Sequence, residues 1–309
     1  MTGTFPPLAP GVWGILATPF RGPDLAVDTA SLERLVGLYR RVGARGVVAL
    51  GVLGEAARLD SAERELVLET VAAAAGDLPV VAGMSATATA PAMEEARRAV
   101  RCGAQACMVL VPTAERVQLV DHLRRISDAA GCGIVVQDHP LSTGITIPAP
   151  VLAAAASESG VAVAIKAEAP PTPPTVDVLS RESDIPVFGG LGGVGLLDEL
   201  LAGASGAITG FAFPEGLVAT VDAWWNGGFE AARSAYLPWL PLVVFEGQVK
   251  FGLAIRKETL LRRGLIEDPR VRAPGVGMPE ELSAVLDAHL AALSADAQVR
   301  GAPGFAVAV

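Results

Sequence analysis

The chain has 309 residues, of which 51% are hydrophobic and 18% are charged, and its formal net charge is −9. This composition supplies a large core and excludes global disorder, while the acidic balance argues against a nucleic-acid-binding surface. No apolar run reaches the roughly 18 residues of a membrane span, and residues 1–10 lack the basic and apolar regions of a signal peptide. We therefore expect a cytoplasmic protein with no nucleic-acid or membrane partner.

The number and spacing of the cysteines and histidines indicate which metal sites and disulfides the chain can form. Cys102, Cys107 and Cys132 are odd in number and none forms a CxxC pair, so we expect buried thiols rather than disulfides or a thiolate zinc site. No cluster of His, Asp or Glu has metal-ligand spacing. The sequence therefore predicts neither a metal nor a cofactor.

Short, continuous apolar runs recur along the first two thirds of the chain. Continuous rather than alternating runs are typical of strands buried on both faces. Eight such runs are found, at residues 12–17, 46–51, 79–84, 106–111, 133–137, 161–166, 185–188 and 207–211.

Helical patterns separate these runs. Apolar residues spaced by three and four positions follow residue 32, Asp60 and Glu63 form a capping box, and glycines such as Gly103 and Gly131 stand where helices should end. Strands alternating with helices in this way predict an α/β fold, a (β/α)₈ barrel. We assign residues 1–216 to the barrel and residues 217–309 to a C-terminal helical region packed on it.

The strand ends are the place to look for chemistry, because the active site of such a barrel lies at their C-terminal ends. The last predicted strand brings Thr209 there, and a glycine-rich loop at 189–195 follows the seventh. Gly190 within this loop allows the backbone to pass close to a substrate. The spacing Gly190-x-Gly192-x-x-Gly195 also fits a dinucleotide fingerprint, but no Rossmann unit surrounds it.

Lys166 is the sharpest single feature of the sequence. The chain has 24 basic residues but only three lysines, and Lys166 is the only one among the first 249 residues. It follows an apolar strand, where burial lowers the pKa of an amine and makes it a nucleophile towards carbonyls. The functional hypothesis is a Schiff-base lysine. The structural alternative is a lysine paired with Glu168 or Glu55 at the rim of the barrel.

Three segments in this order resemble the dihydrodipicolinate synthase / N-acetylneuraminate lyase family of Schiff-base aldolases. GVLGE at 51–55 is similar to the family's GTTGE turn, QDHPLSTG at 137–144 to its YNxPxRTG segment, and Ile165-Lys166 to the strand that carries its imine lysine. The resemblance covers about residues 11–295. It implies a barrel in which Lys166 forms an imine with pyruvate or another 2-oxo acid, followed by carbon–carbon bond chemistry or loss of water. It also implies a homo-oligomer, a dimer or a homotetramer.

The chain departs from the family pattern at several positions. Gln137 occupies the place of the family's proton-shuttling tyrosine, and Val52 and Leu53 replace its two threonines. Ser142 stands where the synthase has an arginine for a distal carboxylate. The resemblance therefore predicts a lyase whose partner substrate lacks that carboxylate. Genuine 4-hydroxy-tetrahydrodipicolinate synthase activity and a catalytically silent 2-oxo-acid-binding barrel are the alternatives.

The remaining site residues follow from these segments. Backbone N–H groups at Val52, Leu53 and Gly54 could cradle the carboxylate of a 2-oxo acid. Pro140 makes its predecessor extended, so His139 should face the same side as Gln137 and act as acid or base; a simple hydrogen-bonded strand end is the alternative. Asp138 and Glu55 are further acid/base candidates, although Glu55 is also expected to fix loops. Ser142 and Thr143 are expected to line the pocket.

Several other residues carry less specific expectations. We expect His122 and His289 to lie on the surface, because both stand beside charged residues in helical patterns. Arg256, Lys257 and Glu246 lie in the C-terminal helical region, where a solvated face or a subunit contact is expected.

Overall fold

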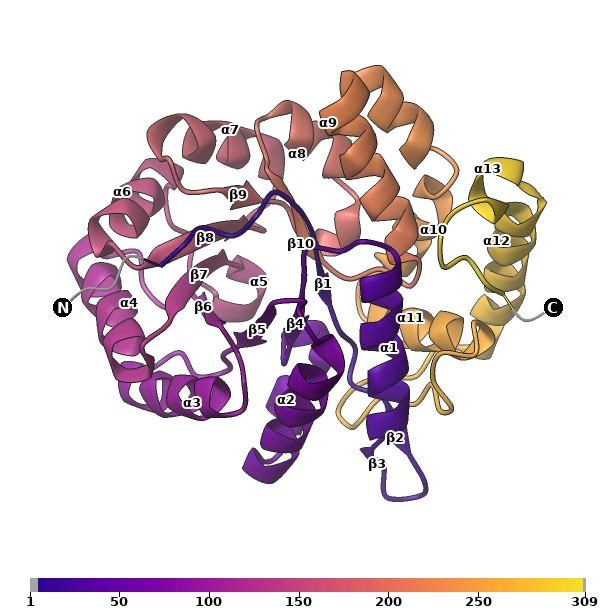
Figure 1. The fold of residues 1–309 in the computed structure, drawn as a ribbon, viewed down its shortest axis with the longest axis horizontal. Coiled ribbons are helices and arrows are strands. Elements are labelled where there is room, and N and C mark those ends of the chain that lie inside the picture. Colours follow the sequence, from indigo (N-terminus) through magenta and orange to yellow (C-terminus); the bar gives the residue numbers. More distant parts are fainter. Residues whose placement is uncertain (1–4, 308–309) are drawn as a thin grey trace.

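Eight parallel strands form a barrel at the centre of the computed structural model, which describes residues 5–307 (Figure 1). The sheet order is β10-β1-β4-β5-β6-β7-β8-β9, and a bridge between Gly189 and Ala207 brings its last strand to its first. The predicted (β/α)₈ barrel is thus confirmed. The strands are β1 (Gly11–Ile15), β4 (Gly46–Ala49), β5 (Val80–Gly83), β6 (Ala106–Leu110), β7 (Gly133–Asp138), β8 (Ala162–Ala167), β9 (Val187–Phe188) and β10 (Gly206–Thr209).

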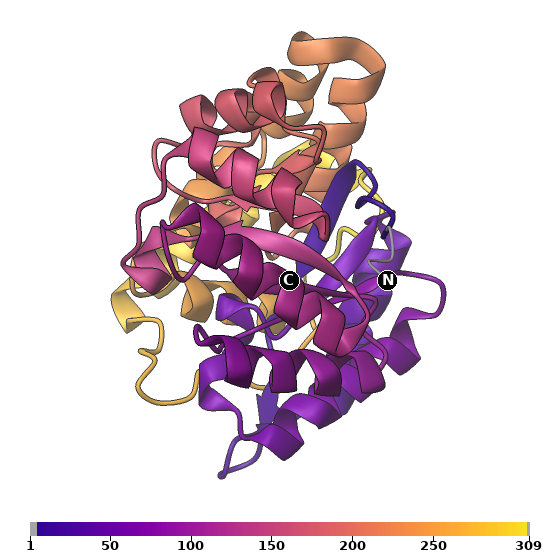
Figure 2. The same ribbon diagram turned by 90° about the vertical axis from the view of Figure 1, so that its left-hand side faces the viewer.

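Helices cover the outside of the barrel and pack side by side around it (Figure 2). A short hairpin, β2 (Phe20–Arg21) with β3 (Ala26–Val27), and a single turn, α5 (Pro140–Thr143), extend from the strand ends. The surrounding helices are α1 (Thr29–Arg41), α2 (Ser61–Ala75), α3 (Thr89–Arg101), α4 (Arg116–Ala130), α6 (Ala149–Ser159), α7 (Thr172–Glu182), α8 (Leu196–Leu201) and α9 (Pro214–Tyr236).

The strands are buried on both faces, which explains their continuous apolar runs. Alternate side chains point into the barrel, where Trp13, Val48, Met108 and Phe188 belong to one buried cluster. The residues between them face the helices and join the larger outer core. Local signals also agree with the structure, because the Asp60–Glu63 capping box begins α2.

The C-terminal helices gather on one side of the barrel (Figure 1). They are α10 (Leu240–Glu246), α11 (Gly252–Arg262), α12 (Ser283–Ala295) and α13 (Ala297–Arg300). The tail beyond them returns to the barrel, where the ring of Phe305 stacks on that of Phe213. None of the helices in residues 5–307 is long and apolar enough to cross a membrane.

Two expectations about polar residues were wrong. Glu246, Arg256 and Lys257 are buried rather than solvated, because Arg256 pairs with Glu246 and Lys257 pairs with Glu55 across the end of the barrel. His122 is also buried and bonds Thr89 Oγ1 through Nδ1 at 2.9 Å. Burial lowers the pKa of His122, which favours the neutral ring in the core.

Candidate active site

A cavity of about 540 Å³ opens at the C-terminal ends of the barrel strands. Its floor consists of side chains from the ends of β1, β7, β8 and β10, and its rim comes from the loops after β4 and β9 and from residues 243–256. This is the place where the fold predicts an active site. The predicted site residues that line the cavity are Val52, Leu53, Gln137, His139, Lys166 and Thr209.

Lys166 is buried at the end of β8, with its ammonium beside a carboxylate. Its Nζ lies 3.0 Å from Oε2 of Glu168. Residues two apart on a strand point to the same face, which explains why both side chains reach the cavity. The ion pair with Glu168, which was the structural alternative, is therefore present, and Lys166 also lines the cavity, where the Schiff-base hypothesis requires it.

Glu168 is held by a network of donors. Gln137 Nε2 donates to Oε2 at 2.7 Å, and the backbone N–H of Leu191 donates to Oε1 at 3.2 Å. Burial acts to raise the pKa of Glu168, but Lys166, His139 and Gln137 outweigh it, so the pKa lies below its usual range. Glu168 is thus ionised at neutral pH and serves as the counter-ion of the Lys166 side chain beside it.

His139 lies in the cavity lining, on the same side of β7 as Gln137. Its Nδ1 is 2.6 Å from Ser142 Oγ, and burial lowers its pKa, partly opposed by the charge of Glu168. Asp138 lies between the two on the other face of the strand, where burial and then Glu168 raise its pKa to about 6. Thr143 bonds backbone groups, and neither Thr143 nor Ser142 is among the residues that line the cavity, contrary to the expectation for both.

The segment after β4 forms a 3₁₀ turn, Val52–Gly54, at the cavity edge. The N–H of Gly54 donates to the carbonyl of Gly51 at 2.9 Å and is therefore used within the turn. The N–H groups of Val52 and Leu53 begin the turn, where such groups have no partner inside it. Of the three N–H groups expected to bind a substrate carboxylate, those of Val52 and Leu53 therefore remain for a ligand anion, and that of Gly54 does not.

Glu55 lies outside the cavity lining and acts as a structural anchor. Its carboxylate pairs with Lys257 Nζ, with Arg58 Nη1 at 2.8 Å and with the backbone N–H of Arg272 at 2.9 Å. Lys257 also lies 4.2 Å from the ring centre of Phe20. The anchor therefore ties α11 and the loop after it to the strand-end turn at 52–54.

Replacing Lys257 by methionine is expected to lower the free energy of unfolding by about 3 kcal/mol or more, because Glu55 would keep its buried charge while losing one partner. Urea unfolding followed by circular dichroism measures this change. Lys250→Met is the matched control, since Lys250 is exposed and its replacement should change stability little. Equal stability of both variants would contradict the anchoring role of Lys257.

Comparison with known proteins identifies relatives of the whole barrel and its C-terminal helices. The model of the dihydrodipicolinate synthetase family matches residues 9–293. The chain belongs to this family. It is 30% identical over 290 residues to L-2-keto-3-deoxyarabonate dehydratase of Azospirillum brasilense, covering 91% of this chain and 92% of the relative. It is 29% identical to 4-hydroxy-tetrahydrodipicolinate synthase of Methanothrix thermoacetophila, covering 75% of this chain and 80% of the relative.

A solved structure agrees with these matches. The dihydrodipicolinate synthase of Rhodopseudomonas palustris superimposes with a TM-score of 0.87 at 31% identity, covering 94% of this chain and 99% of the other. The resemblance inferred from the three sequence segments is thereby confirmed.

The glycine-rich loop after β9 separates two carboxyl groups in this member of the dihydrodipicolinate synthetase family. A Cβ on Gly190 would lie 2.3 Å from Oε1 of Glu168, and one on Gly189 would lie 1.7 Å from Oε2 of Glu199. Gly190 therefore leaves room for the Glu168 carboxylate and is not among the residues that line the cavity. Thr209 Oγ1 accepts the N–H of Gly192 at 2.9 Å and fixes the loop over the site.

Glu199, on α8, is fully buried and accepts a hydrogen bond from Thr172 Oγ1 at 2.6 Å. Burial raises its pKa from 4.5 to about 7, with Thr172 opposing and with Glu168 and Asp198 adding to the rise. A raised folded-state pKa means that the folded protein holds a proton that the unfolded chain releases above pH 4.5. Stability should therefore fall between pH 4.5 and pH 7.

Glu199→Gln is expected to remove this pH dependence, since glutamine carries no ionisable proton. Relative to the parent, the variant should gain about 2.5 kcal/mol of unfolding free energy between pH 5 and pH 8, which is the part of the pKa shift that falls within this pH range. Urea unfolding at the two pH values measures the gain. A difference between the two proteins that is the same at both pH values would show that Glu199 titrates normally.

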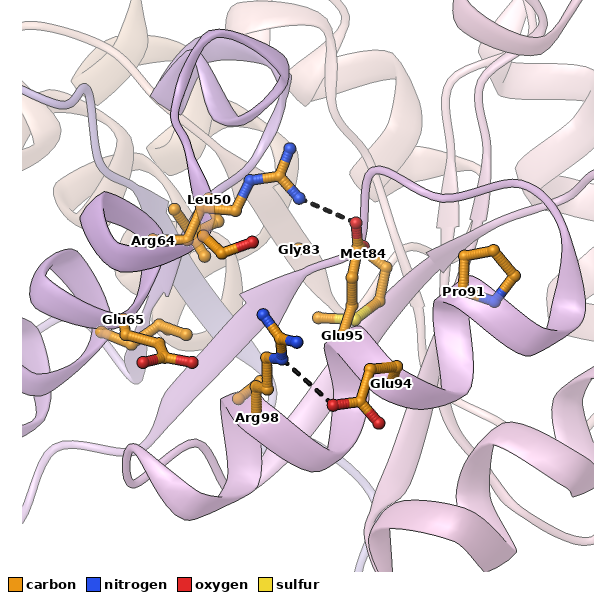
Figure 3. Close-up of a pocket in the computed structure, with 12 residues that line it drawn as sticks. Leu50, Arg64, Glu65, Gly83, Met84, Pro91, Glu94, Glu95 and Arg98 are labelled. Atoms are coloured by element: carbon orange, nitrogen blue, oxygen red, sulfur yellow. Dashed lines mark hydrogen bonds and ion pairs between the residues drawn. The ribbon is translucent and has the colours of Figure 1, made fainter.

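A second cavity, of about 230 Å³, lies outside the barrel between α2 and α3 (Figure 3). Arg64 pairs there with Glu95 at 2.7 Å, and Arg98 pairs with Glu94 at 3.1 Å. None of the described residues that line it is a lysine, histidine or cysteine. Both of its arginines are paired with glutamates, so we look for the chemistry in the cavity at the strand ends.

Sequence reasoning assigned Glu168 only as a structural partner of Lys166 and missed its place at the centre of the network. The signal was present, because Lys166-x-Glu168 spaces a nucleophile and a base by two strand positions. Within residues 5–307, no three His, Cys, Asp or Glu side chains lie close enough together to hold a metal ion.

Proposed function

We propose that this chain, a lyase of the dihydrodipicolinate synthetase family, forms a Schiff base between Lys166 and the ketone of pyruvate or another 2-oxo acid. One observation carries the proposal. The Lys166 amine is buried at the floor of a 540 Å³ cavity and lies 3.0 Å from the carboxylate of Glu168. A desolvated amine beside a proton acceptor is an activated nucleophile for a carbonyl carbon.

Glu168 is the first proton acceptor in the proposed reaction. It takes a proton from the Lys166 ammonium, and the neutral amine adds to the ketone carbon to give a carbinolamine. The carbinolamine oxygen then leaves as water after it is protonated, and the imine remains. Gln137 holds Glu168 in place through its amide, and His139 is the second acid/base group within the cavity lining.

The protonated imine then acts as an electron sink for the adjacent carbon. In an aldol cleavage, the hydroxyl proton at C4 is removed, the C3–C4 bond breaks and its electrons enter the enamine, so that an aldehyde leaves. In a dehydration, a proton leaves C3 and hydroxide leaves C4. Hydrolysis of the imine releases the product in both cases. The similarity to a 2-keto-3-deoxy acid dehydratase supports a 4-hydroxy-2-oxo acid as substrate.

The substrate carboxylate is proposed to bind at the turn after β4. The N–H groups of Val52 and Leu53 begin a 3₁₀ turn at the cavity edge and would supply the positive ends of two peptide dipoles, without the side-chain hydroxyls of the family's threonines. Thr209 and the loop that it fixes form the opposite side.

Synthase activity and a silent binding barrel receive less support. Gln137 cannot titrate in the place of the family's tyrosine, and Ser142 cannot hold a distal carboxylate as arginine does. The placement of a buried Lys166–Glu168 pair at the cavity floor argues against a silent barrel. We further propose a cytoplasmic enzyme that assembles as a dimer or homotetramer of identical chains, as the resemblance implies.

Borohydride trapping tests the proposal directly. The protein is incubated with pyruvate, reduced, digested and examined by peptide mass spectrometry. An adduct on the peptide that contains Lys166 is expected. If neither pyruvate nor larger 2-oxo acids label Lys166, the Schiff-base mechanism is wrong.

A further inference from the structure

We infer that the partner fragment of the substrate, the part beyond C4 of a 4-hydroxy-2-oxo acid, is apolar. The inference rests on the proposed Schiff-base function and adds the substrate class. The reaction is cleavage to pyruvate and an aliphatic or aromatic aldehyde, or loss of water to give the corresponding unsaturated 2-oxo acid. Both reactions balance without any co-reactant.

The rim of the cavity is unusually apolar for an exposed surface. Val52, Leu141, Val194 and Val249 all line the cavity, and they are 53%, 78%, 43% and 93% exposed. Single exposed apolar side chains are common, but a cluster around one opening marks a binding surface for an apolar ligand. Leu53, Leu191 and Leu253 continue this surface into the cavity.

Three of the cationic side chains that line the cavity already form ion pairs with carboxylates of the protein. Lys166 pairs with Glu168, Arg58 pairs with Glu55, and Arg256 pairs with Glu246. Arg256 Nη1 has no hydrogen-bond partner among residues 5–307, but this atom is inaccessible to solvent. A second carboxylate on the substrate would therefore meet no free cation inside the cavity.

Lys250 is the remaining cation of the lining and lies on the exposed loop at its edge. Its Nζ is 5.2 Å from the ring centre of Phe251. The polar side chains beside Lys166 on the cavity floor are Gln137, His139, Glu168 and Thr209. In the proposed mechanism they contact the reacting end of the substrate. Apart from Gln248, the glycines and the charged residues, the rest of the rim is valine and leucine, whose side chains offer no hydrogen bond to hydroxyl groups further along the substrate.

The test compares 4-hydroxy-2-oxo acids that differ only beyond C4, with substrate loss and both products followed by liquid chromatography. The probes are 4-hydroxy-2-oxopentanoate, 4-hydroxy-2-oxooctanoate, 4,5-dihydroxy-2-oxopentanoate and 4-hydroxy-2-oxoglutarate. We expect kcat/KM to rise about fourfold for each added methylene and to be lowest for the dicarboxylate. Trapping of pyruvate on Lys166 is measured in parallel, because it does not depend on the part beyond C4.

Two rim variants test the surface itself. Val194→Arg and Leu141→Arg each place a cation at the opening, and each should raise kcat/KM for 4-hydroxy-2-oxoglutarate relative to the octanoate by about tenfold or more. Val117→Arg is the matched control, since Val117 is 74% exposed on α4 and lies outside the cavity lining, so the ratio should stay as in the parent.

The outcomes separate the two proposals. A preference for the octanoate over the dicarboxylate that the two rim variants reduce, and that Val117→Arg leaves unchanged, supports the inference. A preference for the dihydroxy acid or the dicarboxylate, with pyruvate still trapped on Lys166, overturns the inference and leaves the Schiff-base function standing. Absence of trapping with every 2-oxo acid overturns the proposed function, and the inference falls with it.

Discussion

Lys166→Arg is expected to abolish turnover, lowering kcat/KM by about 10⁴-fold or more while leaving the fold intact. Arginine keeps the positive charge next to Glu168, so the buried carboxylate retains a partner. A guanidinium is always protonated and cannot form the imine. The measurements are substrate loss with 4-hydroxy-2-oxo acids and the borohydride adduct, which should disappear from the Lys166 peptide.

The exposed Lys250 provides the control for this experiment. Lys250→Arg removes an amine at the edge of the same cavity, and the adduct on the Lys166 peptide should persist. An adduct that survives Lys166→Arg but is lost in Lys250→Arg would place the imine on Lys250 instead. Circular dichroism of both variants checks that they are folded.

Glu168→Gln should lower kcat by about 10² to 10⁴-fold, the range expected for the loss of one general acid/base group. Glutamine keeps the shape of the side chain but cannot take the proton of the Lys166 ammonium or return one to the carbinolamine oxygen. The adduct should still form on Lys166, at a lower rate, because the nucleophile is present. The rate is measured by adding borohydride to samples of the reaction at increasing times and quantifying the adduct on the Lys166 peptide.

A surface carboxylate supplies the comparison. Glu182→Gln, on the exposed end of α7, should leave kcat unchanged. If Glu168→Gln retains kcat within about threefold of the parent, the proton is carried by another group and Glu168 only holds Lys166 in place. His139→Asn would then be expected to show the larger loss, since His139 is the other titratable group on that side of the cavity.

The barrel was predictable from the sequence because each strand is buried on two faces, and this produces a continuous apolar run. The run at 185–188 shortens to Val187–Phe188 in the structure, and the run at 207–211 ends at Thr209, because hydrogen bonding rather than hydrophobicity sets strand ends. The site was predictable as far as the strand ends reach, since topology brings them to one edge.

Long-range ion pairs were not predictable in the same way. Glu55 and Lys257 stand 202 positions apart, and each taken alone is an ordinary charged residue of a loop or a helix. Their burial becomes visible only when the C-terminal helices are placed across the end of the barrel. His122 was misassigned for a related reason, because its charged neighbours along the helix say nothing about the face that meets α3.

The burial of two of the three lysines restricts how this protein can be attached to a surface. Lys166 and Lys257 are inaccessible, so among the three lysines only Lys250 offers its side-chain amine to an amine-reactive resin or sensor chip. This lysine stands at the mouth of the cavity, and a protein anchored there would turn its opening towards the support and exclude substrate. An immobilised form that retains access would carry arginine at position 250 and a new lysine on the outer helices, for example in place of Arg181, which is exposed on α7.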